Sequence, residues 1–334
     1  MPIFEGFKNL NEDELVDCFC EIFYHELESW FSADIACCDS CYDEFISKWP
    51  AVYTRYYDFQ KSCIDINCFY SNTRLKDYFY EDEFSNLISN IYCPNCGNPI
   101  YAYMWPYNLN FSIPKNFESI LHEMDRISKK TPFLLLTHPF AKKTLKTIKF
   151  LGKNVKAENV ESKYFRARKF EIGKIYNCED FKYPPRDIVK EGRYNHAGTP
   201  VLYLGDSETT CFYELRKPVE GIATAELLIT RPIKILDLIK IEDDWNNPLN
   251  VAAWSSLMSS PNEGDGWYNP QYTFTRFISD CAIASGFDAI KYPSVRLGER
   301  HNIVLLDGCK AWEYINVKNI KERKVIDIMR AGYD

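Results

Sequence analysis

The spacing of apolar residues over roughly the first 130 positions predicts a series of helices. Residues 11–34 begin with acidic side chains and then place apolar residues at helical intervals. Further helices are expected at about 42–62, 73–90 and 116–129, the first two of them rich in Tyr and Phe. We therefore expect residues 1–130 to form a mainly α-helical N-terminal domain.

The pattern changes at about residue 160, where short apolar runs rich in β-branched residues begin. These runs, which read as strands, are 201–204, 222–230, 233–238, 289–292 and 302–306. Helical stretches lie between them, at about 207–216, 247–259 and 270–285. The alternation predicts an α+β domain with a compact sheet over residues 160–334.

A lysine-rich segment separates these two parts. Residues 129–156 contain eight lysines and no acidic residue. The lysines from 142 to 153 alternate with apolar residues, as on an amphipathic helix. We expect residues 131–159 to be a basic helix or linker with a solvated face, and not a nucleic-acid site, because no stacking aromatic residues interleave the lysines.

Composition and charge exclude several classes of protein. Hydrophobic residues make up 46% of the 334 positions and aromatic residues 16%, which is typical of a globular chain. No apolar run reaches the roughly 20 residues of a membrane helix, and the N-terminus has no signal-peptide pattern, so we expect a cytoplasmic protein. Residues 1–100 carry 6 Lys and Arg against 18 Asp and Glu, whereas residues 101–334 carry 34 against 29. The acidic part disfavours nucleic acid, and the mildly basic part favours an anionic small molecule.

Cysteines are concentrated in the acidic part, which holds nine of the 13. Two CxxC pairs occur there, and each such turn places two thiolates on one side of a tight loop. We predict a structural zinc site with four ligands: Cys38, Cys41, Cys93 and Cys96. Cys37 is an alternative ligand to Cys38. The alternative to a metal site is that all four are buried free cysteines.

Polar residues gather in four short segments of the C-terminal part. They are a strand-like KYFRAR at 163–168, the Gly-bounded loop EGRYNHAGTP at 191–200, the helix SETTCFYELR at 207–216 and YPSV at 292–295. The segments resemble the RES family in order and spacing. The matching pieces are YFRAR, GRYNHAGTPVLYLGDSETTCFYE and FDAIKYPSV…HNIVLLDG, which together cover about 160–308.

The resemblance implies a compact split β-sheet with helices, similar to ADP-ribosyltransferases, and cleavage of NAD⁺ by hydrolysis or phosphorolysis, often in growth-arresting toxins. Carried over by position, the family's functional residues are Arg166, Arg193, Tyr203, Glu214 and Ser294. Arg168 replaces Arg166 if the alignment shifts by one pleat. Tyr194 and His196, in the GRYN loop, are further expected contacts of NAD⁺.

The chemistry of these residue types agrees with that activity. Breaking an N-glycosidic bond develops positive charge on the ribose, which a carboxylate such as Glu214 stabilises. Planar guanidinium groups, at Arg166 and Arg193, suit a diphosphate. The chain has no GxGxxG fingerprint, so NAD⁺ is expected as a substrate and not as a hydride carrier.

Two further expectations concern partners and alternatives. RES domains are sometimes preceded by a HEPN-like helical domain, and residues 1–130 resemble that arrangement but lack the Arg-x4–6-His motif of HEPN ribonucleases. We therefore expect a regulatory domain that binds an antitoxin or another partner, with self-association plausible and no membrane partner. The competing functions are transfer of ADP-ribose to a macromolecule and a non-enzymatic, zinc-containing interaction protein.

Overall fold

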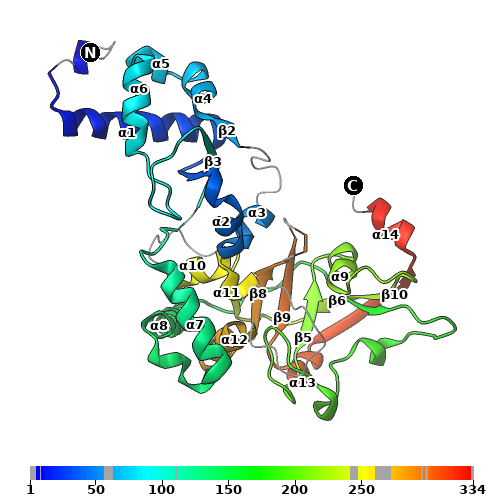
Figure 1. Ribbon diagram of the computed structural model, residues 1–334. Helices are drawn as coiled ribbons and strands as arrows, with labels where there is room; N and C mark the ends of the chain where they lie inside the picture. Colours follow the sequence, from blue (N-terminus) through cyan, green and yellow to red (C-terminus); the bar gives the residue numbers. More distant parts are fainter. Residues whose placement is uncertain are drawn as a thin grey trace. The chain divides into compact units, whose positions relative to one another are not determined.

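The chain forms two compact units, residues Met1–Ile113 and Pro114–Asp334. A computed structural model (Figure 1) describes residues 5–7, 9–55, 63–109, 111–240, 247–259, 272–294, 296–297 and 300–331. Each unit has its own elements and its own buried residues. The mixed α+β class predicted from the sequence is confirmed.

The N-terminal unit is built on α1 (Glu12–Phe31), which begins where the acidic run predicted a helix start. Asn11 Oδ1 accepts a hydrogen bond from the amide of Glu14, and the Glu14 carboxylate accepts one from the amide of Asn11, both at 3.0 Å. This reciprocal capping box satisfies amides that the first helical turn leaves without partners. One face of α1 is buried through three apolar side chains: Phe19, Phe23 and Leu27.

Short helices and a small sheet complete this unit. The helices are α2 (Tyr42–Lys48), α3 (Pro50–Arg55), α4 (Ile66–Asn72), α5 (Leu75–Tyr78) and α6 (Glu81–Leu87). The expected helix at 42–62 is thus divided in two where Pro50 begins α3, and residues 56–62 lie outside the described part. The antiparallel sheet has the order β1 (Ile35–Cys38), β3 (Tyr103–Tyr107), β2 (Ile64–Asp65), and the sequence pattern did not predict it.

The C-terminal unit contains a seven-stranded sheet with the order β10-β6-β4-β5-β9-β8-β7. Its strands are β4 (Tyr164–Lys169), β5 (Leu202–Gly205), β6 (Ile222–Ile229), β7 (Ile235–Asp237), β8 (Ala289–Pro293), β9 (His301–Leu305) and β10 (Ile315–Arg323). Neighbouring strands are antiparallel, except that β7 and β8 are parallel. The five predicted strand segments and KYFRAR all lie in this sheet.

The sheet is nearly divided between its two central strands. β4 pairs with β6 over six residues, but with β5 only at Phe165 and Gly205. The strands on either side of this junction form continuous ladders. The split that the RES resemblance implies therefore lies between β4 and β5.

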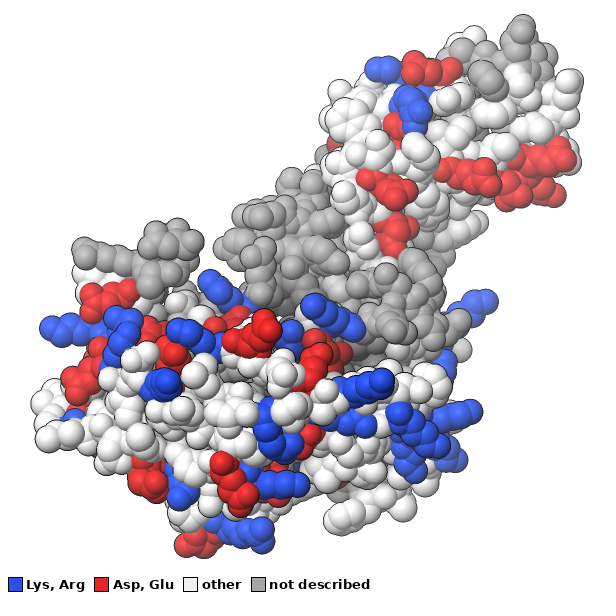
Figure 2. All heavy atoms as spheres, turned by 180° about the vertical axis from the view of Figure 1, so that it is seen from behind, with Lys and Arg blue, Asp and Glu red and all other residues white. Residues whose placement is uncertain are grey.

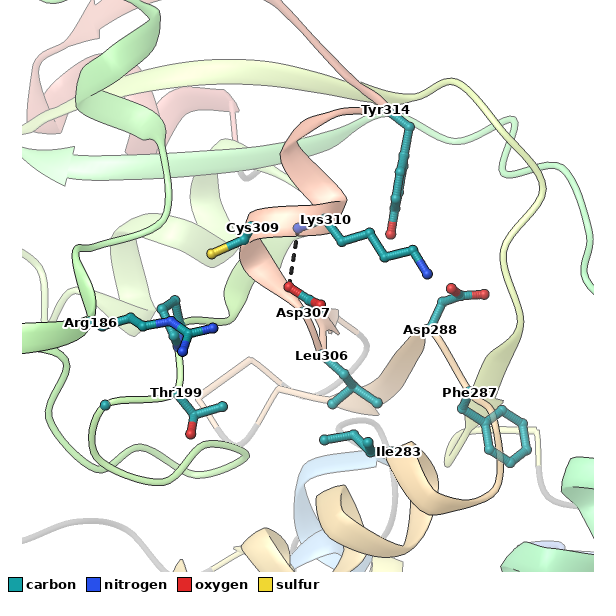
Figure 3. Close-up of a pocket in the computed structure, with 12 residues that line it drawn as sticks. Arg186, Thr199, Ile283, Phe287, Asp288, Leu306, Asp307, Cys309, Lys310 and Tyr314 are labelled. Carbon is teal, nitrogen blue, oxygen red and sulfur yellow. Dashed lines mark hydrogen bonds between the residues drawn. The ribbon is translucent and has the colours of Figure 1, made fainter.

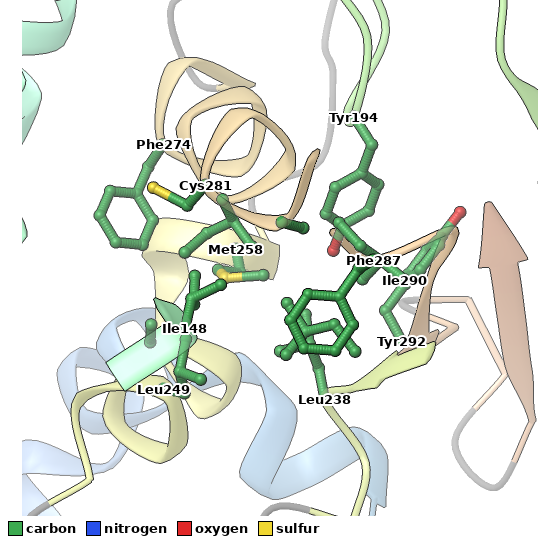
Figure 4. Packing of buried hydrophobic residues seen from close by; sticks show 14 of the residues in the cluster. Ile148, Tyr194, Leu238, Leu249, Met258, Phe274, Cys281, Phe287, Ile290 and Tyr292 are labelled. Atoms are coloured by element: carbon green, nitrogen blue, oxygen red, sulfur yellow. The ribbon is translucent and has the colours of Figure 1, made fainter. Parts of the chain in front are cut away.

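Helices flank this sheet (Figure 1). They are α7 (Phe117–Lys130), α8 (Pro139–Asn154), α9 (Glu208–Glu214), α10 (Pro248–Trp254), α11 (Ser256–Ser259), α12 (Thr273–Ala284), α13 (Gly308–Trp312) and α14 (Val325–Ala331). Expected residues 270–271 of the last predicted helix lie outside the described part. Figure 4 shows Ile148 of α8 in one cluster with Leu249 of α10, Phe274 of α12 and Ile290 of β8.

The lysine-rich helix α8 is thus part of the C-terminal unit. The sequence predicted a domain boundary at about 130 and a basic helix or linker over 131–159. A helix is present there, and the compact units divide between Ile113 and Pro114. Ala141, Thr144 and Ile148 are fully buried on one side of α8, and this burial ties the helix to the core. Among the described residues, we find no helix long and apolar enough to span a bilayer.

Candidate active site at the split of the sheet

A pocket of about 410 Å³ opens at the junction between β4 and β5. Because the two strands separate after a single residue pair, side chains from both can line a common space. Its polar lining comes from β4, the GRYN loop, β5, α9, the residue before α12, β8 and β9: Arg166, Arg168, Arg193, Tyr203, Glu214, Tyr272, Tyr292 and Asn302. Five of the predicted site residues therefore meet here: Arg166, Arg168, Arg193, Tyr203 and Glu214.

Glu214, the last residue of α9, is the acidic residue of this lining. Two side chains hold its carboxylate. Ser294 Oγ donates to Glu214 Oε1 at 3.0 Å, and Asn302 Nδ2 donates to the same oxygen at 2.9 Å. Charge-assisted hydrogen bonds of this kind fix the orientation of a carboxylate.

Ser294 lies behind the pocket and supports Glu214 from there. It is 1% exposed, and it is not among the residues that line the pocket. The amide of Arg296 donates to Ser294 Oγ at 3.2 Å, which leaves the hydroxyl proton for Glu214. The geometry gives Ser294 the part of a positioning residue, not that of a group that touches a ligand.

Arg166 crosses the split in the sheet. Its Nη1 donates to the carbonyl oxygen of Tyr203 on β5 at 2.9 Å, while its Nε is buried and has no hydrogen-bond partner among the described residues. Burial, together with the charge of Arg168, lowers the pKa of Arg166 to about 9. A buried cation with one unused N–H is suited to an anionic ligand.

Arg168 is held by the backbone of a neighbouring segment. Its Nε donates to the carbonyl of Asp180 at 2.7 Å, and its Nη2 donates to that of Lys182 at 3.1 Å. Burial lowers the pKa of Arg168 as well, against the attraction of Asp180. Both arginines line the pocket, so the structure does not require a choice between them.

The GRYN loop is locked by Tyr203 and Asn195. The Tyr203 hydroxyl accepts from the amide of Tyr194 at 2.8 Å and donates to Asn195 Oδ1 at 3.0 Å. A Cβ added at Gly192 would collide with Asn195 Oδ1 and come within 2.9 Å of the Tyr203 hydroxyl. Only glycine fits at position 192 while this pair is in place.

Arg193 of the same loop lies between two aromatic rings. Its guanidinium carbon is 5.8 Å from the ring centre of Tyr272 and 5.7 Å from that of Tyr292. Burial alone would lower the pKa of Arg193, but the electrostatic influence of Tyr292, Tyr194 and Glu214 outweighs it, and the pKa is raised. Arg193 is therefore a permanent cation on the same pocket as Glu214.

Two predicted contacts of the loop lie elsewhere. Tyr194 is 1% exposed and packs in the core, with its ring centre 4.6 Å from that of Tyr292. His196 is exposed, and its Nε2 lies 3.0 Å from both carboxylate oxygens of Asp280 on α12. Neither lines the pocket with Glu214. The reason is the attachment of the loop to α12, where Thr275 Oγ1 donates to the carbonyl of Arg193 and Ser279 Oγ donates to that of Tyr194.

Three residues of the polar lining are not among the predicted site residues: Tyr272, Tyr292 and Asn302. Asn302 carried a usable signal, since a polar residue stands at the start of an otherwise apolar strand, in the segment HNIVLL. Tyr292 stood next to Pro293-Ser294 in a segment that was already suspected. Tyr272 precedes α12, and no pattern in the sequence marks it.

A second pocket of about 310 Å³ lies on the same unit (Figure 3). Arg186 and Lys310 line it together with Asp288 and Asp307. The acids have partners of their own: Asp307 accepts from the amide of Lys310 and caps α13, and Asp288 pairs with Arg231 at 3.0 Å. None of the predicted site residues lines this pocket.

The predicted cysteine ligands come together in the N-terminal unit. The Sγ atoms of Cys38, Cys41, Cys93 and Cys96 all lie within 4.8 Å of one another. Cys38 ends β1, and Cys93 and Cys96 lie in a turn where Gly97 has a φ of 73°. The amide of Asn98 points to Cys96 Sγ at 3.5 Å, as amides do around thiolate ligands.

Cys37 stands beside this cluster and not within it. Its buried Sγ is 3.5 Å from that of Cys93, and by donating a hydrogen bond it lowers the pKa of Cys93. Four thiolates at mutual distances of this size suit a tetrahedral S₄ site, for which zinc is the usual ion. The donor set therefore fits a structural metal, with Cys38 and not Cys37 as the ligand.

Comparison with known proteins places the pocket in a family. The model of the RES domain matches residues 165–323, from β4 to the end of β10. No curated protein matches the chain. One solved structure, described as the crystal structure of the M. tuberculosis MbcT-MbcA toxin-antitoxin complex, is similar at a TM-score of 0.37 and 8% identity, over 56% of this chain and 97% of that chain. Residues 165–323 of this chain are a RES domain.

Proposed function

We propose that the pocket at the sheet split binds NAD⁺ and cleaves its nicotinamide–ribose bond. The observation that carries the proposal is the convergence of one anchored carboxylate, Glu214, with the guanidinium groups of Arg166, Arg168 and Arg193 on a single pocket. NAD⁺ has a diphosphate, which guanidinium groups bind. It also has a ribose that becomes positively charged during cleavage, which a carboxylate stabilises.

Glu214 faces the developing positive charge in this mechanism. As the C1′–N bond breaks, its electron pair leaves with nicotinamide, which is neutral and needs no strong acid. The ribose carbon becomes electron-poor, and the carboxylate stabilises it. Ser294 and Asn302 both donate to Oε1. The other oxygen, Oε2, accepts no hydrogen bond from the described residues, so it is available to the ribose.

The arginines hold the anionic part of the substrate. Arg166 keeps an unused buried Nε–H, and Arg193 keeps its charge between two aromatic rings. Planar guanidinium groups bind phosphate oxygens in pairs, which fixes the substrate as well as neutralising it. Tyr203 adds the face of its ring to the wall, since its hydroxyl is engaged in the loop.

The bond to C1′ is completed by an oxygen of water or of inorganic phosphate. With water, the products are ADP-ribose, nicotinamide and one proton. With phosphate, they are ADP-ribose 1-phosphate and nicotinamide. Either reaction would deplete the cellular pool of NAD⁺, so we propose a growth-arresting toxin or defence effector that an antitoxin or other regulatory protein restrains through the N-terminal unit.

The test is incubation of the purified chain with NAD⁺ labelled in its adenine part, with and without phosphate. Release of free nicotinamide with soluble labelled product supports the proposal, and the product identifies the acceptor. Label retained on protein would instead assign an ADP-ribosyltransferase. No release of nicotinamide from NAD⁺ would overturn both and leave a zinc-containing interaction protein.

We further propose that zinc is the ion of the cysteine cluster. Its support is the donor set of Cys38, Cys41, Cys93 and Cys96 and their close spacing. A site filled by four thiolates has no open position for water, so the metal would stabilise the N-terminal unit and take no part in the reaction. Metal analysis that finds well under one equivalent after purification without chelators would contradict this.

A further inference from the structure

A stripe of lysines runs along the outward face of α8. It consists of Lys142, Lys146, Lys149 and Lys153, all exposed. At about 100° per residue these positions project to one side of the helix, opposite the buried side of Ala141, Thr144 and Ile148. We call these four residues the lysine stripe.

The lysine stripe has no acidic partner among the described residues, and it borders apolar surface. A groove of about 470 Å³ is formed by the stripe together with Leu145 and Phe150. Phe150 is 66% exposed. Like charges one turn apart repel each other along a helix, so an acidic surface placed on this face would relieve repulsion and cover Phe150 together.

The same chain carries a surface of the opposite charge on α1. Asp13, Asp17, Glu21 and Glu28 project to one side of that helix and are all exposed, and none of them has a basic partner among the residues that the structure describes. We call them the acidic stripe. At about 1.5 Å per residue it is about 22 Å long, and the lysine stripe about 16 Å.

We propose that the lysine stripe of one molecule binds the acidic stripe of a second copy of this chain. The two stripes are opposite in charge and similar in helical spacing and roughly in length, and each belongs to a helix anchored in its own unit through its other face. Figure 2 shows that acidic side chains gather on the N-terminal unit and basic ones at one edge of the C-terminal unit.

Charge also argues against polyanionic partners. The whole chain has a net charge of −7, and its residues 1–100 hold 18 acidic against 6 basic side chains, which disfavours a membrane surface or a nucleic acid as the partner. A second copy supplies acidic side chains for the lysine stripe and basic side chains for the acidic stripe.

Charge reversal followed by mixing tests the proposal. One variant carries Lys146→Glu and Lys149→Glu, and the other carries Asp17→Lys and Glu21→Lys. The mass of the full-length wild type is measured against concentration by light scattering after gel filtration and by sedimentation. We expect wild-type association that weakens with added salt, on the order of tenfold weaker association for each variant alone, and recovery when the two variants are mixed.

Controls separate this contact from general charge effects and from the proposed activity. Lys318→Glu with Lys324→Glu changes the net charge as much as Lys146→Glu with Lys149→Glu does, at exposed positions elsewhere, and should associate like wild type. All variants should keep the circular dichroism and the nicotinamide release of the wild type, so loss of the proposed enzymatic function is scored separately. A monomeric wild type, unchanged association of either reversal variant, or no recovery on mixing overturns the proposal. Binding of the monomeric wild type to anionic vesicles, lost in the Lys146→Glu, Lys149→Glu variant, overturns it in favour of a membrane surface.

Discussion

Asn302 on β9 donates a hydrogen bond of 2.9 Å to Oε1 of Glu214 on α9, 88 residues away in the chain. Ser294 donates to the same oxygen at 3.0 Å. The carboxylate that leads the candidate site is thus oriented by two residues from the far half of the sheet, and its second oxygen is left for a substrate.

Replacing Asn302 with Ala should therefore slow the cleavage of NAD⁺. The loss of a hydrogen bond to a charged group corresponds to about 1.5–3 kcal/mol, or roughly a 10- to 150-fold lower kcat. The measurement is the rate of nicotinamide release at saturating NAD⁺. Asn302→Asp, which sets a second carboxylate against Glu214, should be slower still. Equal rates in wild type and Asn302→Ala would remove the positioning role.

Glu214→Gln should abolish most of the activity while the protein stays folded and binds substrate. Removal of one preorganised electrostatic contact in an active site typically costs on the order of 10²–10³ in kcat. Calorimetry with NAD⁺ should show binding within a few-fold of wild type, because the arginines are untouched. A fully active Glu214→Gln protein would refute the proposed mechanism.

Tyr203→Phe tests whether the GRYN loop needs its lock. The change removes the hydroxyl that serves the amide of Tyr194 and Asn195 Oδ1, so two buried polar groups lose a partner. The expected cost in the free energy of unfolding is about 1–3 kcal/mol, measured by chemical denaturation. Activity should fall because Arg193 loses its position. Tyr213→Phe, which changes a half-buried tyrosine outside the pocket lining, is the matched control.

Removal of metal should act on the N-terminal unit alone. A strong chelator, or Cys96→Ser, is expected to lower the midpoint of thermal unfolding and the helical signal of α1, while nicotinamide release at low temperature continues. Cys178→Ser changes an exposed cysteine of the other unit and should leave both unchanged. Loss of activity in step with loss of metal would count against a purely structural ion.

His196 gives the stability of the C-terminal unit a modest dependence on pH. The hydrogen bond with Asp280 raises the pKa of His196 above its usual 6.5 in the folded chain. The stabilisation is therefore complete below about pH 6.5 and is lost as pH rises through the raised value. His196→Gln should unfold more easily than wild type at pH 6 and equally at pH 9. Since both partners are half exposed, the difference should be small and should decline with salt.

Much of the site could be predicted from the sequence because its residues occur in short segments with distinctive spacing. The two CxxC turns and the GRYN and SETTCFYE segments are local patterns. The four cysteines of the two turns lie together, and Arg193 and Glu214 line one pocket, as those patterns predicted. The predicted strands from 201 to 306 are present for a similar reason, since each consists largely of an apolar run.

The rest depended on contacts between distant segments. The direction of His196 and Tyr194 is set by Thr275 and Ser279 of α12, about 80 residues further on. β10 was not predicted, because its sequence has no regular alternation of apolar and polar residues. A bulge between Lys318 and Lys321 interrupts the alternation. The sequence left open whether the lysine-rich segment is a helix or a linker, because the buried face of α8 is short and its charged face dominates the composition.

The division between β4 and β5 has a consequence for how such a chain can change over time. Neighbouring strands usually exchange backbone hydrogen bonds. Here the guanidinium of Arg166 on β4 donates to the carbonyl of Tyr203 on β5 and so replaces one of those bonds. A descendant without the proposed activity would still need a long hydrogen-bond donor at position 166 to keep the two halves of its sheet together. Glu214 bridges no strands, so its replacement would not separate the two halves. Descendants without the proposed activity should therefore vary first at position 214 and last at position 166.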